Sequence, residues 1–375
     1  MNIYLKILFI CVLFTNNLEA AKTVHSIYLV TKSGLVYEEN SQKPFSGFAV
    51  EYHPNERIYW KVQYKKGLLH GTYETYHPNG QLNVSTNTKD GFYSGAYRQF
   101  YDNGNLKVDT NYDSGNYNGK YFDYCSNTNI LTEKTFKMGI LDGVNKKFDC
   151  SGYLQILSNY SNGELHGIYE EYIGETLIKK TNYSYGLIDG SYQTFHENGS
   201  LSEDGTYLQG YLSGEYIFYH PNSNIASRAY YVNGKINGEY TEYDSAGNLT
   251  NKRNYNSGDL MLDVYYNING IAVKISNYKN GKYHGQVISR YNNGNVSEVH
   301  TWENGKLNGE MIRREENGTL IEWANYKNDV LHGKRMINRA NITVDVERYE
   351  NGEFVEFLGR IENPQELKKI LNINP

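Results

Sequence analysis

The chain has 375 residues, and its composition is dominated by 38 Tyr and 36 Gly against only 6 Pro. Tyr favours strands and Gly favours turns, so this composition indicates many short strands. The net charge is −5 and the basic residues are scattered singly, which disfavours nucleic acid and anionic membranes as partners. A hydrophobic content of 39% is low for a thick two-layer core and suits a thin sheet.

Residues 1–21 have the layout of a secretory signal peptide. Lys6 supplies a minimal positive region, residues 7–14 form an apolar stretch, and the segment ends in Ala20 and Ala21. The apolar stretch is too short to span a bilayer. The alternative, a buried N-terminal strand, explains the apolar stretch but not the small residues after it. We therefore expect an exported protein, periplasmic or secreted, with no membrane insertion after cleavage.

A glycine ruler runs through residues 46–357. Most ruler glycines are 24 residues apart, and they are Gly71, Gly95, Gly119, Gly143, Gly167, Gly190, Gly214, Gly238, Gly285, Gly309 and Gly333. Each unit also holds a turn such as residues 77–80, His-Pro-Asn-Gly, and a Gly-x-apolar-x-Gly link such as residues 163–167. Glycine and Asn-Gly supply the positive φ angles that tight turns need, so each unit is predicted to be a β-hairpin.

The hairpins are predicted to stack into one all-β fold. A lone hairpin is only marginally stable, so neighbouring units must pair edge to edge. We expect an elongated, single-layer antiparallel β-hairpin array in which each unit touches only its neighbours, on the order of 100 Å long or more. Residues 22–45 are expected to form N-terminal capping strands. Residues 358–375 are expected to form a short helical cap that begins at Asn363 and covers the last strand.

The repeat resembles a known family. The pattern Y-x-x-G-x-L-x-G-x-Y-x-x-Y-x-x-N-G, with His-Gly pairs at residues 70–71, 166–167, 284–285 and 332–333, is similar to MORN repeats. It is most similar to the bacterial MORN-variant repeat of the YwqK-type antitoxin-like proteins, over about residues 46–356. The resemblance implies a hairpin array, and the antitoxin-like members imply a protein that occludes a toxin or enzyme.

One row of aromatic residues is the candidate binding site. It lies on the second strand of successive units and consists of Tyr207, Tyr231, Tyr255, Tyr278 and Trp302. If these rings are exposed, about 10 Å apart, they form a ladder that can hold an extended ligand. If they are core, they stabilise the sheet through cross-strand aromatic pairs. The core interpretation has the stronger physical basis, and the sequence leaves both open.

Four histidines share one repeat place just before the turn, namely His53, His77, His196 and His220. Equivalent places in neighbouring units lie roughly 10 Å apart, whereas each ligand of one zinc ion lies about 2.0–2.1 Å from it. The spacing therefore predicts a role in the turn and no metal site.

The cysteines leave a disulfide open. Once Cys11 is removed with the signal peptide, Cys125 and Cys150 remain at nearly equivalent places in adjacent units. Two exported cysteines favour a bond, but their expected Cα separation of about 9–10 Å exceeds the roughly 5.5–6 Å that a disulfide prefers. Flexible turns could close this gap.

The sequence predicts no catalytic residues, no cofactor and no metal, because no chemical constellation stands outside the repeat. We expect a monomeric, exported, non-enzymatic scaffold that binds a protein partner through an extended β surface. The alternatives are an antitoxin-like inhibitor of a toxin or enzyme and a cell-envelope glycan-binding module.

Overall fold

The structure is a computed structural model that describes residues 22–340 and 342–362. The predicted signal peptide and the predicted helix from Asn363 lie outside the described residues. The chain divides into two units, residues 1–164 and residues 165–375. None of the described residues belongs to a helix long and apolar enough to cross a membrane.

Unit 1 consists of short N-terminal strands followed by repeat strands, with one 3-10 turn, η1 (Ser26–Tyr28). The strands are β1 (Thr23–His25), β2 (Leu29–Lys32), β3 (Leu35–Glu38), β4 (Gly47–Tyr52), β5 (Ile58–Lys65), β6 (Leu68–Tyr76), β7 (Leu82–Lys89), β8 (Phe92–Phe100), β9 (Leu106–Asp113), β10 (Asn116–Tyr124), β11 (Ile130–Lys137), β12 (Ile140–Leu141), β13 (Gly143–Phe148) and β14 (Leu154–Ser161).

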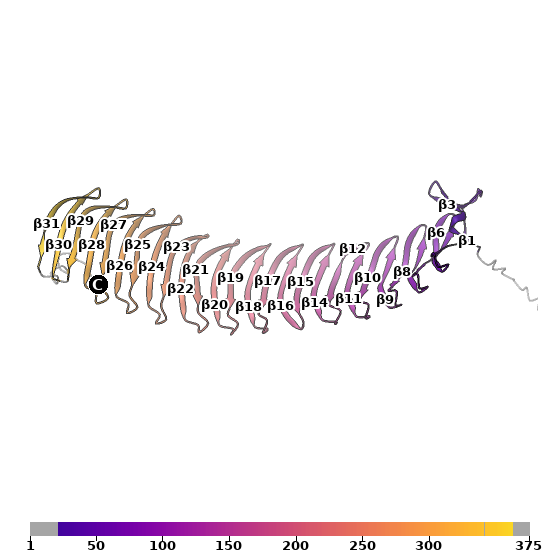
Figure 1. The fold of residues 1–375 in the computed structure, drawn as a ribbon, viewed down its shortest axis with the longest axis horizontal. Coiled ribbons are helices and arrows are strands. Elements are labelled where there is room, and N and C mark those ends of the chain that lie inside the picture. The colour runs from indigo at the N-terminus through magenta and orange to yellow at the C-terminus, as the bar shows by residue number, and fades with distance from the viewer. Residues whose placement is uncertain (1–21, 341, 363–375) are drawn as a thin grey trace, which may run out of the picture. The chain divides into compact units, whose positions relative to one another are not determined.

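The repeat strands of unit 1 form an antiparallel meander. From β4 to β11 each strand pairs with the next, β11 then pairs with both β12 and β13, and β13 pairs with β14. Strand β1 joins the other side of β4 in parallel, and β2 and β3 form a separate hairpin. Residues 22–45 thus hold three short strands and the turn η1 (Figure 1).

Unit 2 continues the same repeat in longer, more regular strands. They are β15 (Glu164–Ile173), β16 (Thr176–Ser184), β17 (Leu187–Phe195), β18 (Leu201–Leu208), β19 (Tyr211–Tyr219), β20 (Ile225–Val232), β21 (Lys235–Tyr243), β22 (Leu249–Asn256), β23 (Asp259–Tyr266), β24 (Ala272–Lys279), β25 (Lys282–Arg290), β26 (Val296–Glu303), β27 (Lys306–Arg314), β28 (Leu320–Lys327), β29 (Val330–Arg339), β30 (Thr343–Glu350) and β31 (Glu353–Ile361).

Each strand of unit 2 pairs antiparallel with the next, in sequence order (Figure 1). The prediction of an all-β, single-layer hairpin array is therefore confirmed within each unit. Strand β31 runs to Ile361, so residues 358–361 form strand rather than the start of the helical cap.

The two kinds of turn differ from the prediction. The two-residue turn lies in the link, where Asn233 and Gly234 have φ angles of 50° and 75°, as a type I′ turn requires. The His-Pro-Asn-Gly segment belongs to a five-residue loop closed by a hydrogen bond from the His77 N–H to the Gln81 carbonyl, 2.8 Å long. Among the described residues of that loop, Gly80 alone has a positive φ, 87°.

The ruler glycines lie inside strands rather than between them. Gly95, for example, has a φ of 83° within β8, at a shift in the register between β7 and β8. This is a β-bulge, which needs a residue that tolerates positive φ and adds one residue to the strand. The strands are eight or nine residues long in most units.

The two faces of the sheet differ. We call the face that carries the second-strand aromatics the ring face; in the pair β8–β9 it holds Tyr97 and Tyr112, opposite Thr110 and Gly95. The other face, the back face, carries cross-strand ion pairs such as Arg98–Asp109, 3.5 Å apart. Successive side chains of a strand point to opposite faces of the sheet, so alternate residues share a face.

Buried apolar clusters mark the ends of the repeat. In unit 1, Phe45, Ala49 and Val62 are buried on the ring face, and the β2–β3 hairpin covers them with Leu29 and Val36. In unit 2, the cluster lies on the back face and consists of Ile312, Leu320, Trp323, Met336 and Val344. Elsewhere in the described parts, the interior is thin and rests mostly on half-buried side chains.

Candidate binding surfaces

The turn-start side chains bond each hairpin to the next. His77 Nε2 lies 3.0 Å from the carbonyl oxygen of Phe100, 23 residues further along. Because a carbonyl only accepts, the His nitrogen must carry the proton. The same contact recurs for His53, His196 and His220, and the phenol oxygens of Tyr101 and Tyr291 make it in their own units. The predicted turn histidines therefore also bond neighbouring repeats to one another, a role that the sequence analysis did not predict.

The turn asparagines have a double role. Asn79 Oδ1 accepts a hydrogen bond from the Gln81 N–H at 2.9 Å, while its Nδ2 donates to the Asp102 carbonyl of the next turn at 2.7 Å. Residues at the same place that bond in both ways are Asn55, Asn127, Asn198, Asn222 and Asn293. The side chains named here bond to neighbouring turns of the same protein, and we assign no ligand site to them.

Cys125 and Cys150 form a disulfide, with Cα atoms 5.7 Å apart. The expected 9–10 Å was wrong because it gave the two turns the full repeat spacing, whereas they lie closer together: Asn127 and Asn129 of one turn both donate hydrogen bonds to the Cys150 carbonyl of the next. Cys125 occupies the turn-start place, whose side chain reaches toward the next turn, and Cys150 lies one residue past the equivalent place, Asp149. The disulfide therefore stands where other units have the His or Tyr hydrogen bond.

The predicted binding row is half-buried on the ring face. Four of its members stand opposite ruler glycines: Tyr207 opposite Gly190, Tyr231 opposite Gly214, Tyr255 opposite Gly238, and Trp302 opposite Gly285. The row residues do not form one ladder; each contacts a neighbouring ring instead, as in the Tyr192–Tyr207 pair with centroids 5.4 Å apart. Tyr255 and Tyr278 likewise contact Tyr240 and Tyr283.

The densest ring packing lies in unit 1, at residues that were not predicted as a site. The Tyr cluster, as we call it, is an unbroken series of ring contacts with centroids 4.7–6.0 Å apart. Its members are Tyr73, Tyr93, Tyr97, Tyr112, Tyr117, Tyr121 and Phe136. The sequence signal was a Tyr two residues before the ruler Gly, where most units carry an aliphatic residue.

Burial raises the pKa of several phenols in this cluster. It raises the pKa of Tyr121 to about 12, with the nearby Asp123 carboxylate adding to the effect. Burial also raises the pKa of Tyr93 and Tyr112 well above the usual range. These three phenols therefore stay protonated above the pH at which an ordinary phenol ionises.

A second unpredicted surface lies on the back face of β17–β20. The back patch consists of Leu187, Leu208, Tyr211, Tyr230 and Val232, whose exposed fractions run from 45% for Val232 to 63% for Tyr211. Leu208 and Tyr211 are register partners. A Cβ at Gly210 would lie 3.7 Å from Leu187, and one at Gly234 would lie 3.3 Å from Tyr211, so each side chain leans over the next link glycine.

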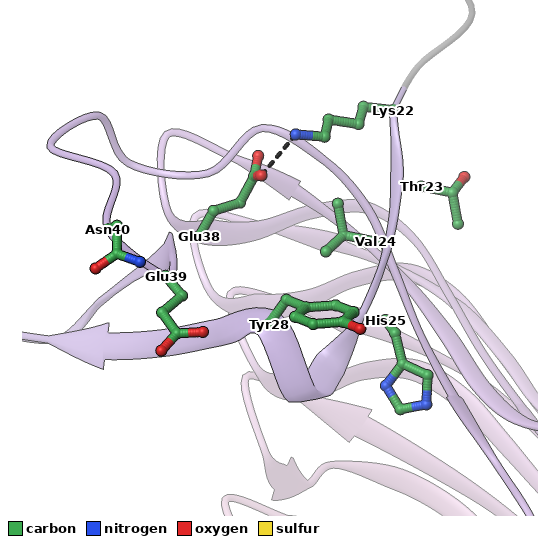
Figure 2. A pocket seen from close by; sticks show the side chains of 8 residues that line it. All are labelled: Lys22, Thr23, Val24, His25, Tyr28, Glu38, Glu39 and Asn40. Atoms are coloured by element: carbon green, nitrogen blue, oxygen red, sulfur yellow. Dashed lines mark hydrogen bonds and ion pairs between the residues drawn. The ribbon is translucent and has the colours of Figure 1, made fainter.

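An open hollow of about 410 Å³ lies beside β1 and η1. Figure 2 shows Lys22 and Glu38 joined across it, with Nζ and Oε2 2.5 Å apart, and His25 and Tyr28 below. Glu51, on the neighbouring β4, accepts a hydrogen bond from Ser26, which is the main reason that its pKa is lowered. These groups are paired with one another, and we assign no chemistry to the hollow.

The comparisons with solved structures return parts of much larger chains. A Photorhabdus luminescens Tc holotoxin pore is 12% identical, with 86% of this chain and 24% of that chain covered and a TM-score of 0.16. A TcdB2–TccC3 structure without its hypervariable C-terminal region is 10% identical, with 83% and 22% covered and a TM-score of 0.12. This chain spans about a quarter of their length, and we draw no argument from TM-scores this low.

No curated protein matches the chain. The family model described as MORN repeat variant matches five segments, residues 69–90, 93–114, 188–209, 212–233 and 236–257. Each segment begins two residues before a ruler glycine and spans one turn-start loop of the hairpins described above. The match does not address the antitoxin-like subfamily, which stays a prediction. With its hairpin array and these five matches, the chain is a MORN-repeat protein.

Proposed function

We propose that the chain is an exported, non-enzymatic scaffold that binds a protein partner at the back patch. The observation that carries this proposal is the exposure of five large apolar side chains on one face of four consecutive strands. Soluble monomers rarely expose contiguous apolar surface without a use for it, and such patches mark interaction sites. The aromatic and aliphatic mixture is typical of the centre of a protein interface.

The position of the patch also favours a protein partner. Its residues occupy variable places of the repeat, and the same places in later units hold Lys235 and Asp259. Ion pairs such as Arg228–Glu215, 3.0 Å apart, lie on the same face. An apolar centre beside charged groups is the usual layout of a protein interface.

The disulfide supports the export part of the proposal. Disulfides persist in oxidising compartments and are rare in the cytosol. The bond between Cys125 and Cys150, together with a signal-like segment at residues 1–21, fits a protein that folds after export. We expect the mature chain to begin at Ala21 or Lys22. N-terminal sequencing of exported material tests this; an intact Met1 in cytoplasmic protein would contradict it.

Partner capture tests the binding part. The mature chain is immobilised and exposed to the exported fraction of its own cells, and a retained protein is identified. In the variant Leu208→Ser/Tyr211→Ser we expect capture to fall by at least about tenfold, since central apolar anchors carry most of the binding energy. Thermal unfolding should change little, because both side chains are largely exposed.

Phe92→Ser is the matched control. Phe92 occupies the place of Tyr211 in a unit-1 hairpin and is equally exposed, at 61%. The proposal requires that this variant retain the partner. Equal loss in both variants would indicate nonspecific apolar adhesion, and unchanged capture in Leu208→Ser/Tyr211→Ser would refute the back patch as the interface.

A further inference from the structure

The ring face of unit 1 is free of charge over several strands. From Trp60 on β5 to Tyr112 on β9, the paired ring-face positions hold Tyr, Thr, Val, Leu, Gln, Trp and Gly. The charged ring-face side chains that bound this stretch are Glu51, opposite Trp60, and on the other side Asp123 on β10 and Lys134 on β11, whose Nζ lies 5.6 Å from the centre of the Tyr121 ring. The back face of the same strands carries Lys61, Glu74 and other charges, so this segregation does not result from a shortage of charged residues.

Unit 2 lacks this uncharged surface. Its ring face is crossed by buried or half-buried ion pairs, including Arg253 with Asp263 at 3.4 Å and Arg335 with Glu322 at 2.7 Å. Tyr216 there donates a hydrogen bond to Glu203 at 2.6 Å. The same repeat thus presents aromatic rings with neutral hydroxyls in one unit and aromatic rings with charges in the other.

Part of the Tyr cluster lies beyond the N-terminal covering. The β2–β3 hairpin packs over the buried cluster at Phe45, Ala49 and Val62, whose partly buried neighbours extend as far as Tyr73. Beyond Tyr73, on β8–β10, the rings of Tyr93, Tyr97, Tyr112 and Tyr117 are half-buried against one another and retain exposed area. Within the described residues this area faces solvent.

We propose that the Tyr cluster on the ring face of β8–β10 binds a neutral polysaccharide. Sugar rings offer apolar C–H surfaces, which pack against aromatic faces, and hydroxyls, which pair with the Tyr hydroxyls and with water. A ligand without charge matches the uncharged ring-face positions of β7, β8 and β9, which hold Tyr, Thr, Val, Gln and Gly. The site is separate from the back patch in both face and chemistry, so it goes beyond the proposed function.

A peptide fits this surface less well. The backbone groups of β8 and β9 are already paired with neighbouring strands on both sides, so an added strand finds no edge there. A peptide laid across the rings would leave many of its own amides without partners, and desolvated unpaired amides are costly. A polysaccharide carries no such backbone requirement, and its outer hydroxyls stay in water.

Native affinity electrophoresis of the purified mature chain tests the proposal. The gels contain hydroxyethylcellulose, laminarin, dextran or galactomannan, with alginate as a charged comparison. We expect at least one neutral polymer to retard the chain and alginate to have no effect. The variant Tyr97→Phe/Tyr117→Phe, which keeps the rings and loses two hydroxyls, should bind the same polymer several-fold more weakly.

Two charge insertions on one strand provide the matched pair. Gln99→Glu places a carboxylate on the ring face of β8, whereas Ala96→Glu places one on the back face of the same strand. Retardation should fall about tenfold in the first and persist in the second, with both variants showing a native circular dichroism spectrum. The proposal is overturned if no neutral polymer retards the chain, if only alginate does, or if the two Glu variants behave alike.

Discussion

At the residue scale, the turn-start side chain determines how one hairpin attaches to the next. Its hydrogen bond reaches a carbonyl 23 residues away and adds a side-chain contact to the backbone ladder. His and Tyr both satisfy the place, because each presents an N–H or O–H donor on a planar ring of suitable length. In these units the place therefore needs a donor and not histidine chemistry, whereas Asp149, Asp244 and Glu315 occupy it elsewhere.

Replacing His77 tests this account. His77→Ala removes the bond to the Phe100 carbonyl and should lower stability by about 0.5–1.5 kcal/mol, the usual net contribution of one hydrogen bond. His77→Tyr should lie close to wild type, because Tyr101 makes the equivalent bond in the next unit. Urea unfolding midpoints measure both. A Tyr variant as unstable as the Ala variant would contradict the role of the bond.

At the element scale, the disulfide clamps two consecutive hairpins at their turn edge. Its sequence separation of 25 residues predicts a stabilisation of about 3.5 kcal/mol in the chain-entropy model. Asn127 and Asn129 also donate hydrogen bonds to the Cys150 carbonyl, so the edge is held in several ways. Loss of the disulfide should therefore weaken this edge without abolishing the fold.

The variant Cys125→Ser/Cys150→Ser should lose most of that stabilisation in chemical denaturation. In Cys125→His/Cys150→Ser, the new imidazole should reach the carbonyl of Phe148, the residue that corresponds to Phe100 in the unit of His77. We expect the His variant to recover about 1 kcal/mol relative to the Ser variant. If the two variants unfold at the same denaturant concentration, a side chain at position 125 does not make the turn-start hydrogen bond to the next hairpin.

The periodic parts of the fold could be predicted from the sequence, and the surfaces could not. The glycine ruler and the turns recur at fixed spacing, so the hairpins and their antiparallel order follow from turn chemistry. The disulfide needed the distance between the two turns, which the repeat spacing does not contain. The back patch occupies variable places, and its signal, apolar residues such as Leu187 and Tyr211 at one variable place in consecutive units, is visible only once the faces are known.

At the scale of the whole molecule, tyrosine burial couples stability to alkaline pH. Burial is the main cause that raises the pKa of Tyr121 and Tyr240 to about 12, and for Tyr76 and Tyr172 an adjacent Glu adds to it. In the unfolded chain phenols ionise near pH 10. Between pH 10 and 12 the folded state therefore holds more protons than the unfolded state, and stability must fall as pH rises.

Denaturation midpoints at pH 9, 10.5 and 11.5, combined with tyrosinate absorbance, measure this coupling. In the folded chain, one group of phenols should stay protonated above pH 10 and titrate only as the chain unfolds. Titration of all phenols near pH 10 in a chain that stays folded would show that the rings are not desolvated.

The central claim is that the back patch is where this scaffold contacts another protein, and crosslinking in the native cell tests it most directly. Benzoylphenylalanine replaces Tyr211 in one strain and Phe92, its counterpart in unit 1, in another. Irradiation should produce a discrete adduct of larger mass from position 211, in exported material, and none from position 92. The absence of any adduct at 211, or the same adduct from both positions, would contradict the claim.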